Sequence, residues 1–106
     1  MKKLRVLATM VTVMLTAELG RIEFQGHDET WYNLPMQKVV SNAMSNGIVL
    51  DYWERADGCK MYGHYIICAG AKYGEIVETS RGTGIVLDTG EFIKEHPADI
   101  DIAVTW

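Results

Sequence analysis

The sequence predicts one mainly β domain of the α+β class, with a single amphipathic helix near its N-terminal side. Toward the C-terminus, short runs rich in Ile, Val and Tyr alternate with glycine-bearing turns, which is typical of β-strands. One earlier stretch places apolar residues three and four positions apart, which is the helical pattern. The chain has 106 residues, of which 48% are hydrophobic. That is enough to bury one compact core and too little for two.

The first residues differ in composition from the rest of the chain. A basic start, Met1 to Arg5, precedes the uncharged apolar run Val6 to Ala17. This order predicts a signal peptide over residues 1–20, because a membrane-spanning helix needs roughly 20 apolar residues. The same run would also suit an uncleaved anchor or an element of the folded domain. The export interpretation predicts a secreted or cell-wall-associated bacterial protein with no stable membrane span.

The next segments are expected to be a linker and then the helix. Residues 21–30 are polar and mixed, so we predict a linker there and an ordered domain over residues 31–106. Asn33 can cap a helix, and Pro35 suits its first turn. Asn46 and Gly47 provide a stop signal. Between these signals, the apolar residues at helical spacing are Met36, Val39, Val40, Ala43 and Met44.

Four later runs are predicted to be strands, since they are short, rich in branched and aromatic residues, and bounded by glycine. They are Tyr65 to Cys68, Glu75 to Thr79, Gly84 to Leu87 and Ile100 to Val104.

Charge and cysteine spacing exclude several classes of function. The net charge is −4, so no basic surface is available to neutralise phosphates, and nucleic acid is not an expected partner. Cys59 and Cys68 do not have the C-x-x-C spacing of a redox or zinc site. A hairpin around Gly63 could bring them together as a disulfide, and two free buried thiols are the alternative. We expect a monomer that needs no cofactor and no metal.

Two aspartates near the C-terminus are the candidate chemical groups. The apolar run that begins at Gly84 ends in Asp88, which is followed by Thr89 and Gly90. In the last strand, alternation sends Ile100 and its period-two partners to one face and Asp101 to the other. If Asp101 meets the Asp88 turn, the two carboxylates share a groove. Their mutual repulsion would then keep one of them protonated near neutral pH, as a general acid requires.

These segments together resemble the closing motif of the three-aspartate (3D) domain. The resemblance is carried by Gly84 to Gly90, then Phe92-Ile93-Lys94, then Ile100-Asp101-Ile102, and it extends back to Trp31 through a Trp-Tyr-x-Leu-Pro-Met start. The family includes MltA-type lytic transglycosylases and small muralytic proteins of Gram-positive bacteria, and similar small proteins occur in Firmicutes and phages. The resemblance implies a small six-stranded double-psi β-barrel that acts on peptidoglycan glycan strands.

The resemblance also implies roles for individual residues. Asp101 matches the aspartate that acts as acid and base in cleavage of the glycosidic bond, and Asp88 matches the aspartate beside it in the groove. Residues around them are expected to contact the glycan: Thr89, Gly90, Glu91 and Lys94. The chain departs from the family twice. No acid stands near Cys68-Ala69-Gly70, where the first aspartate would fall, and Glu91 replaces a usual glycine.

Because of these departures, other functions stay open. A non-catalytic wall-binding module with a degenerate site is the main alternative, and a phage or host structural protein is another. Asp-Thr-Gly is also the signature of retroviral-type aspartic proteases, but only sixteen residues follow Gly90, too few for the flap and second glycine element. A calcium or magnesium site at Asp88, Asp99 and Asp101 would lack oxygen ligands. Alternatively, the aspartates cap a turn or line a solvated strand.

Overall fold

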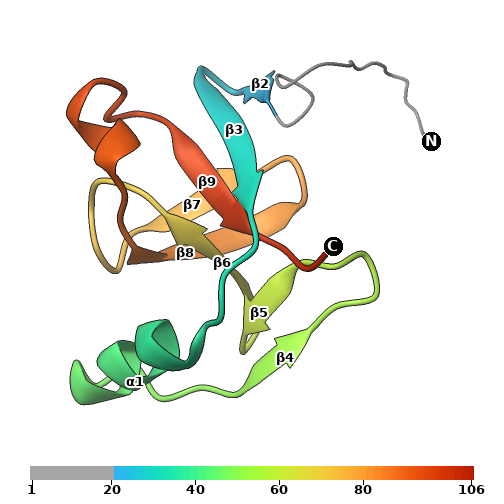
Figure 1. Cartoon of the computed structure of the whole chain (residues 1–106), viewed down its shortest axis with the longest axis vertical. Coiled ribbons are helices and arrows are strands. Elements are labelled where there is room, and N and C mark those ends of the chain that lie inside the picture. The colour runs from blue at the N-terminus through green and yellow to red at the C-terminus, as the bar shows by residue number, and fades with distance from the viewer. Residues whose placement is uncertain (1–20) are drawn as a thin grey trace.

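The computed structural model describes residues 21–106, which form a mainly β fold with one helix (Figure 1). The coarse prediction, mainly β with one amphipathic helix, is therefore confirmed. The strands form an open, mixed, eight-stranded sheet, so the described residues contain more strands than the six that were expected. The predicted signal peptide, residues 1–20, lies outside the described residues.

The elements follow one another in a simple order. They are β2 (Ile22–Phe24), β3 (His27–Tyr32), α1 (Gln37–Ser45), β4 (Tyr52–Glu54), β5 (Lys60–Tyr62), β6 (Tyr65–Ala69), β7 (Ile76–Thr79), β8 (Gly82–Asp88), the 3-10 turn η2 (Glu91–Lys94) and β9 (Ile100–Ala103). The last four strands match the four predicted runs to within two residues at each end.

Strand β6 is the centre of the sheet. The main path is β2-β3-β9-β6-β5-β4, and β8 pairs with β6 while β7 pairs with β8. Two pairs are parallel, β3 with β9 and β6 with β8, and the other pairs are antiparallel. Consequently β6 brings together β8 and β9, the two strands that carry the candidate aspartates.

Residues 21–30, expected to be a linker, instead form the β2–β3 hairpin and belong to the sheet. Its two-residue turn is Gln25-Gly26, and both residues have positive φ, 49° and 89°. That backbone matches the twist of a tight hairpin, and glycine adopts it at no steric cost. The polar composition misled the prediction because β3 pairs in parallel with β9 and buries Glu29 completely.

The helix ends as predicted but begins differently. Gly47 has φ +85°, and the Ile48 amide donates to the Ala43 carbonyl, which closes the last turn. At the other end Met36 takes the cap position and makes no side-chain cap bond. Asn33, the expected cap, instead accepts a 2.7 Å hydrogen bond from the Lys60 ammonium. Of the residues predicted for the apolar face, Ala43 is fully buried.

Alternation along the strands divides the core between two faces of the sheet. One cluster contains Ile66, Cys68, Val86 and Ile102 together with Cys59, Met61, Ile100 and Val104. The other contains Ile67, Ile85, Leu87 and Ala103, and Met36 and Ala43 cover it from the helix side. Helix α1 thus shields only one face of the sheet (Figure 1).

Both cysteines are buried free thiols within the first core cluster. The hairpin around Gly63 does form, since Tyr62 pairs with Tyr65. Burial raises the pKa of the Cys59 and Cys68 thiols, so both are protonated at neutral pH. In residues 21–106 we find no helix with the length and apolar character needed to cross a membrane.

Gly84 is required by close packing between β8 and β6. A Cβ at this position would lie 2.6 Å from the Cys68 Sγ and 3.1 Å from the Ile66 carbonyl oxygen. Both neighbours belong to fully buried residues, and the Ile66 oxygen is part of the backbone, so the added Cβ would force part of the packed core to shift. We expect Gly84→Ala to lower the free energy of unfolding by about 2 kcal/mol or more, the range for overpacked cores. Urea denaturation checks this. Gly90→Ala is the control for an added Cβ atom, because Gly90, like Gly84, has no positive φ, and its Cβ would meet only the half-buried Phe92 ring.

Candidate functional site

A β-bulge determines where Asp88 points. Along β6 and β8, Ile67 pairs with Ile85 and Cys68 with Val86, but Ala69 pairs with Asp88 rather than Leu87. Without the extra residue, alternation would send Asp88 to the face opposite Ile85. The bulge returns it to the same face as Ile85, at the end of the helix-covered side. Bulges of this kind often re-aim a side chain beside a functional site.

Asp88 and Asp101 flank the same residue of the central strand. Ala69 pairs in parallel with Asp88 on β8 and in antiparallel with Asp101 on β9. Residues opposite one another in a ladder point to the same face of the sheet, so both carboxylates project from one face on either side of Ala69. Both aspartates are partly buried. The structure therefore places the two predicted aspartates close to one another on a shared surface.

Strand β3 adds two residues that sequence reasoning did not identify. Thr30 is paired with Asp101, and its hydroxyl donates a 2.8 Å hydrogen bond to the Asp101 Oδ1. Two residues further, the Tyr32 hydroxyl donates a 2.9 Å hydrogen bond to the Asp88 Oδ2. The period-two spacing of Thr30 and Tyr32 is typical of a strand that points both side chains to one face. This signal was missed because residues 21–30 were predicted to be a linker. We call Thr30, Tyr32, Asp88 and Asp101 the carboxylate cluster.

The surroundings of Asp101 raise the pKa of its carboxyl group. Desolvation by burial raises the Asp101 pKa, and the charge on Asp88 raises it further, against the lowering effect of the Thr30 hydrogen bond and of Arg21. Burial and the neighbouring Asp88 also raise the Tyr32 pKa, so this phenol stays neutral and continues to donate. The cluster therefore holds two carboxyl groups in different environments, which is a recurring arrangement in acid and base catalysis.

The four residues expected to contact a glycan follow directly after Asp88. The Thr89 amide donates to the Asp88 Oδ1 at 2.9 Å, which anchors the turn. Gly90 has an extended backbone, and a Cβ there would approach the Phe92 ring at 3.0 Å. Glu91 and Lys94 lie on η2, where they form a 3.4 Å pair with each other and are nearly fully exposed. Thus the Thr89 amide contacts the carboxylate cluster at Asp88, whereas Glu91 and Lys94 extend into solvent.

The Tyr32 hydrogen bond gives a testable pH dependence. The raised Tyr32 pKa means that above about pH 10 the unfolded state loses a proton that the folded state keeps, so stability falls as pH rises. Tyr32→Phe is expected to remove that contribution. The free energy of unfolding should then fall less steeply with pH, and the change in slope should correspond to about one proton. At pH 7 it should cost about 1–2 kcal/mol for the lost bond to Asp88. Chemical denaturation at pH 7 and pH 10.5 tests both expectations, and an unchanged pH slope would contradict them.

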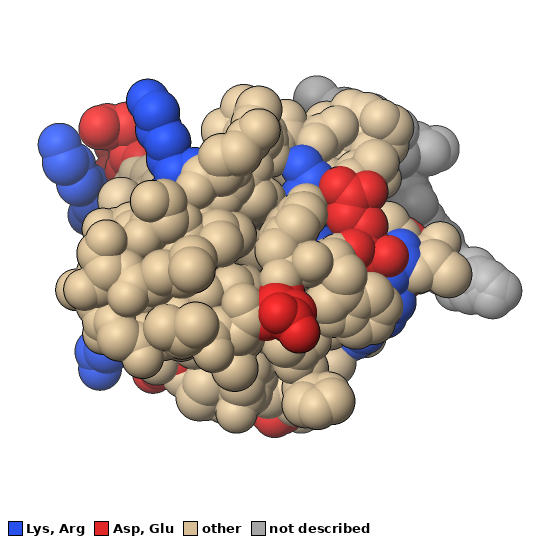
Figure 2. Space-filling model, turned by 90° about the horizontal axis from the view of Figure 1, so that it is seen from below, with Lys and Arg blue, Asp and Glu red and all other residues tan. Residues whose placement is uncertain are grey.

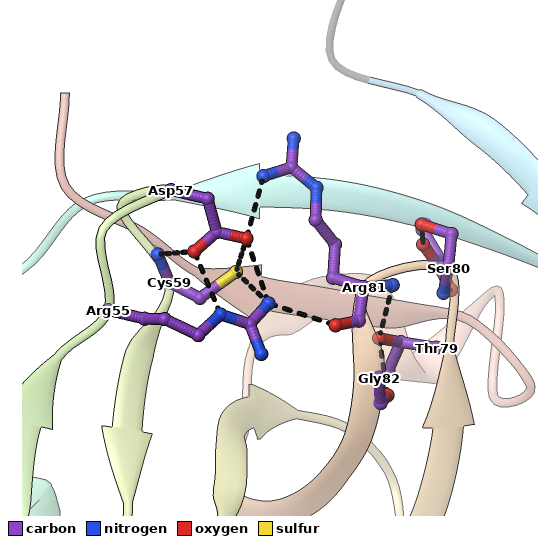
Figure 3. A network of polar contacts seen from close by, with 8 residues as sticks. Arg55, Asp57, Cys59, Thr79, Ser80, Arg81 and Gly82 are labelled. Carbon is purple, nitrogen blue, oxygen red and sulfur yellow. Dashed lines mark hydrogen bonds and ion pairs between the residues drawn. The ribbon is translucent and has the colours of Figure 1, made fainter. Parts of the chain in front are cut away.

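A second polar network lies at the turns that precede β5 and β8, where it has a structural role (Figure 3). Arg55 donates two hydrogen bonds to the Asp57 carboxylate, at 3.0 and 2.8 Å, and one to the Arg81 carbonyl at 2.9 Å. The Arg55 guanidinium holds the pKa of Asp57 well below its usual range. The Asp57 carboxylate also accepts from the Cys59 amide. These bonds tie the β4–β5 turn to the β7–β8 turn.

Several hollows occur on the surface of the described residues, and side chains outside the carboxylate cluster line them. One of about 570 Å³ lies between α1 and β4, one of about 600 Å³ lies beside β7, and one of about 370 Å³ lies near Gly63. The carboxylate cluster is instead a surface site at one end of the sheet. Within residues 21–106, no group of three or more acidic, histidine or cysteine side chains has the geometry to hold a metal ion. Asp99, the third aspartate considered for such a site, contacts the Asp28 amide and Arg21.

Comparisons with known proteins add no relative: no family model matches the chain, and no curated protein or solved structure is significantly similar to it.

Proposed function

We propose that this chain is an exported, peptidoglycan-active protein that cleaves the glycan strand as a lytic transglycosylase does. The observation that carries the proposal is the position of Asp101, a partly buried carboxyl group with a raised pKa that flanks Ala69 opposite Asp88. General acid catalysis needs a carboxyl group that is protonated close to the working pH. A peptidoglycan strand is the substrate implied by the sequence resemblance to 3D domains.

In the proposed reaction Asp101 first donates its proton to the glycosidic oxygen, and the bond from that oxygen to the sugar's C1 breaks. The Asp101 carboxylate then accepts the proton of the 6-hydroxyl of the same sugar, whose oxygen bonds to C1 and closes an anhydro ring. Water is not consumed, so one acid–base residue suffices, in contrast to the two carboxylates of ordinary glycosidases. The charge on Asp88 adds to the effect of burial in raising the Asp101 pKa, and it offers negative charge to the cationic sugar.

Kinship with the 3D domain is part of the proposal, including its closed double-psi barrel. Two parallel pairs within a mixed sheet, β3 with β9 and β6 with β8, support it. The position of Ala69 also supports it. The family's first aspartate would fall near this residue, and Ala69 lies between Asp88 and Asp101. Export to the cell wall is proposed from the sequence of residues 1–20.

The test is product analysis. Purified protein is incubated with peptidoglycan sacculi, and the soluble products are analysed by mass spectrometry. Anhydro-muropeptides are expected. Reducing-end muropeptides would instead indicate hydrolysis, and an absence of soluble products would remove the enzymatic proposal.

A second candidate function, a non-catalytic glycan-binding module, is favoured by the missing acid at Ala69. Cosedimentation with sacculi measures binding independently of cleavage. Binding without cleavage in the unmodified protein would favour this candidate. Ala69→Asp would then test whether restoring a third carboxylate between Asp88 and Asp101 restores cleavage, with Ala69→Asn as the uncharged control.

A further inference from the structure

The groove between α1 and β4 has the features of a ligand site. It is separate from the carboxylate cluster, whose residues do not line it. Its volume is about 570 Å³. One wall is formed by Met36, Val40 and Met44 on successive turns of the helix, and the other by Tyr52 on β4. Figure 2, seen from below, shows this side of the molecule as a broad surface of uncharged side chains with isolated charged groups. Such adaptable, Met-rich walls suit an apolar ligand.

A buried ammonium group also lines this groove. Lys60 is 4% exposed, and its Nζ donates two hydrogen bonds of 2.7 Å, to the Asn33 Oδ1 and the Leu34 carbonyl oxygen. Both acceptors are neutral, and an ammonium group has three hydrogens to donate. Within residues 21–106, no carboxylate lies within ion-pair distance of this nitrogen. A buried charge without an opposite charge is costly, so the groove favours an anionic ligand.

The nearest candidate counter-charge in the chain is directed elsewhere. Glu54 pairs with Lys60 across the β4–β5 ladder, yet its carboxylate accepts a 3.0 Å hydrogen bond from the Tyr52 hydroxyl instead. This arrangement leaves the third Lys60 hydrogen available for a group entering the groove. The ligand must therefore combine an apolar body with an anionic end.

Polar side chains among the walls distinguish a peptide from a hydrocarbon chain. Gln37, Ser41 and Glu54 line the same groove and can pair with amide groups of a ligand. A fatty acid has no amides, and its chain would leave these groups unpaired. We propose that this groove binds the C-terminal end of a short apolar peptide, with the terminal carboxylate held by Lys60. The proposal does not depend on the activity of the carboxylate cluster.

The test compares matched peptides on the full chain by isothermal titration calorimetry. The probe is acetyl-Leu-Ala-Leu-Ala with a free carboxyl end, the matched control is the same peptide with an amide end, and dodecanoate is the hydrocarbon arm. The free acid is expected to bind at least about tenfold more tightly than the amide, the effect of one charge-assisted hydrogen bond. Dodecanoate is expected to bind more weakly than the free acid.

Variants locate the site. Lys60→Met should reduce the affinity for the free acid to that for the amide while leaving the amide affinity unchanged, a comparison that stays valid if the variant is less stable. Met44 is 49% exposed, so Met44→Glu tests the groove without disturbing the core; it should weaken free-acid binding by at least about tenfold through repulsion and loss of apolar contact. Lys38→Met, on an exposed part of α1, is the charge control.

Several results would overturn the proposal. These are equal affinities for acid and amide, no binding at about 1 mM peptide, unchanged binding by both the Lys60 and Met44 variants, or tight binding of dodecanoate alone, which would assign the groove to a lipid.

Discussion

Asp101→Asn is expected to abolish formation of anhydro-muropeptides, by a factor of about 10²–10⁴, the usual contribution of a general acid. Asn has nearly the same shape and can still accept the hydrogen bond from Thr30, but it has no proton to deliver and cannot accept one. Loss of turnover should therefore not be accompanied by loss of structure. Product analysis with sacculi measures the activity, and urea denaturation measures the stability.

The stability of this variant has a predictable sign. Burial and Asp88 raise the Asp101 pKa in the folded state, so the fold prefers the protonated carboxyl group. That preference stabilises the protein below the unfolded-state pKa of about 3.9 and is lost as the pH rises through the folded-state pKa. A neutral Asn avoids this loss. At pH 7 Asp101→Asn should be at least as stable as the unmodified protein, whereas a clear loss of stability would contradict the proposed environment of Asp101.

Asp88 should affect the same reaction through charge. Asp88→Asn removes one cause of the raised Asp101 pKa, so Asp101 should lose its proton at a lower pH and the alkaline limb of the pH–rate profile should move to lower pH. The substitution should also weaken the bonds from Tyr32 and the Thr89 amide, and so destabilise the fold more than Asp101→Asn does. Asp99→Asn is the matched control. An active Asp101→Asn with an inactive Asp88→Asn would transfer the acid role to Asp88.

The strands were predictable where local pattern alone decides them. The runs that became β6, β8 and β9 are short and rich in branched residues, and alternation correctly placed Asp101 on the face opposite Ile100 and Ile102. Asp88 is different, because its direction depends on a bulge opposite Cys68 and Ala69. No local sequence pattern marks that bulge. The sequence therefore could not predict whether the carboxylates of Asp88 and Asp101 lie on the same face of the sheet.

The N-terminal part of the domain was mispredicted because tertiary pairing outweighs composition there. Polar residues 21–30 form a hairpin since β3 finds a parallel partner in β9, 71 residues further along the chain. That pairing supplies Thr30 and Tyr32 to the carboxylate cluster. Likewise, Asn33 is a residue type that often caps helices, but its side-chain oxygen accepts a hydrogen bond from the buried Lys60 instead. Long-range partners of this kind have no signal in a local window.

Glu29→Ala is expected to have the largest effect on stability, a loss of about 2–5 kcal/mol, which is the range for truncating a large, fully buried side chain to Ala. The Glu29 side chain is fully buried and accepts hydrogen bonds from the Ser80 amide at 2.9 Å and the Ser80 hydroxyl at 2.6 Å. The His27 Nε2 lies 3.1 Å from the Glu29 Oε2, the oxygen that also accepts from the Ser80 amide. These bonds hold β3 to the turn between β7 and β8, so Glu29→Ala would release this turn and leave a cavity in place of the buried Glu29 side chain.

A loss of this size is a large part of the total stability of a domain, which is about 5–15 kcal/mol. Asp28→Ala is the matched control, because Asp28 is the adjacent residue and its carboxylate forms an exposed pair with Arg21 at 2.8 Å. An exposed pair of this kind contributes about 0.2–1 kcal/mol. Glu29→Gln should fall between the two variants, since the amide fills the same volume but keeps only one acceptor for the Ser80 donors. Urea denaturation of the three variants tests this order, and a Glu29→Ala loss no larger than that of Asp28→Ala would show that the β3 connection to Ser80 does not stabilise the sheet.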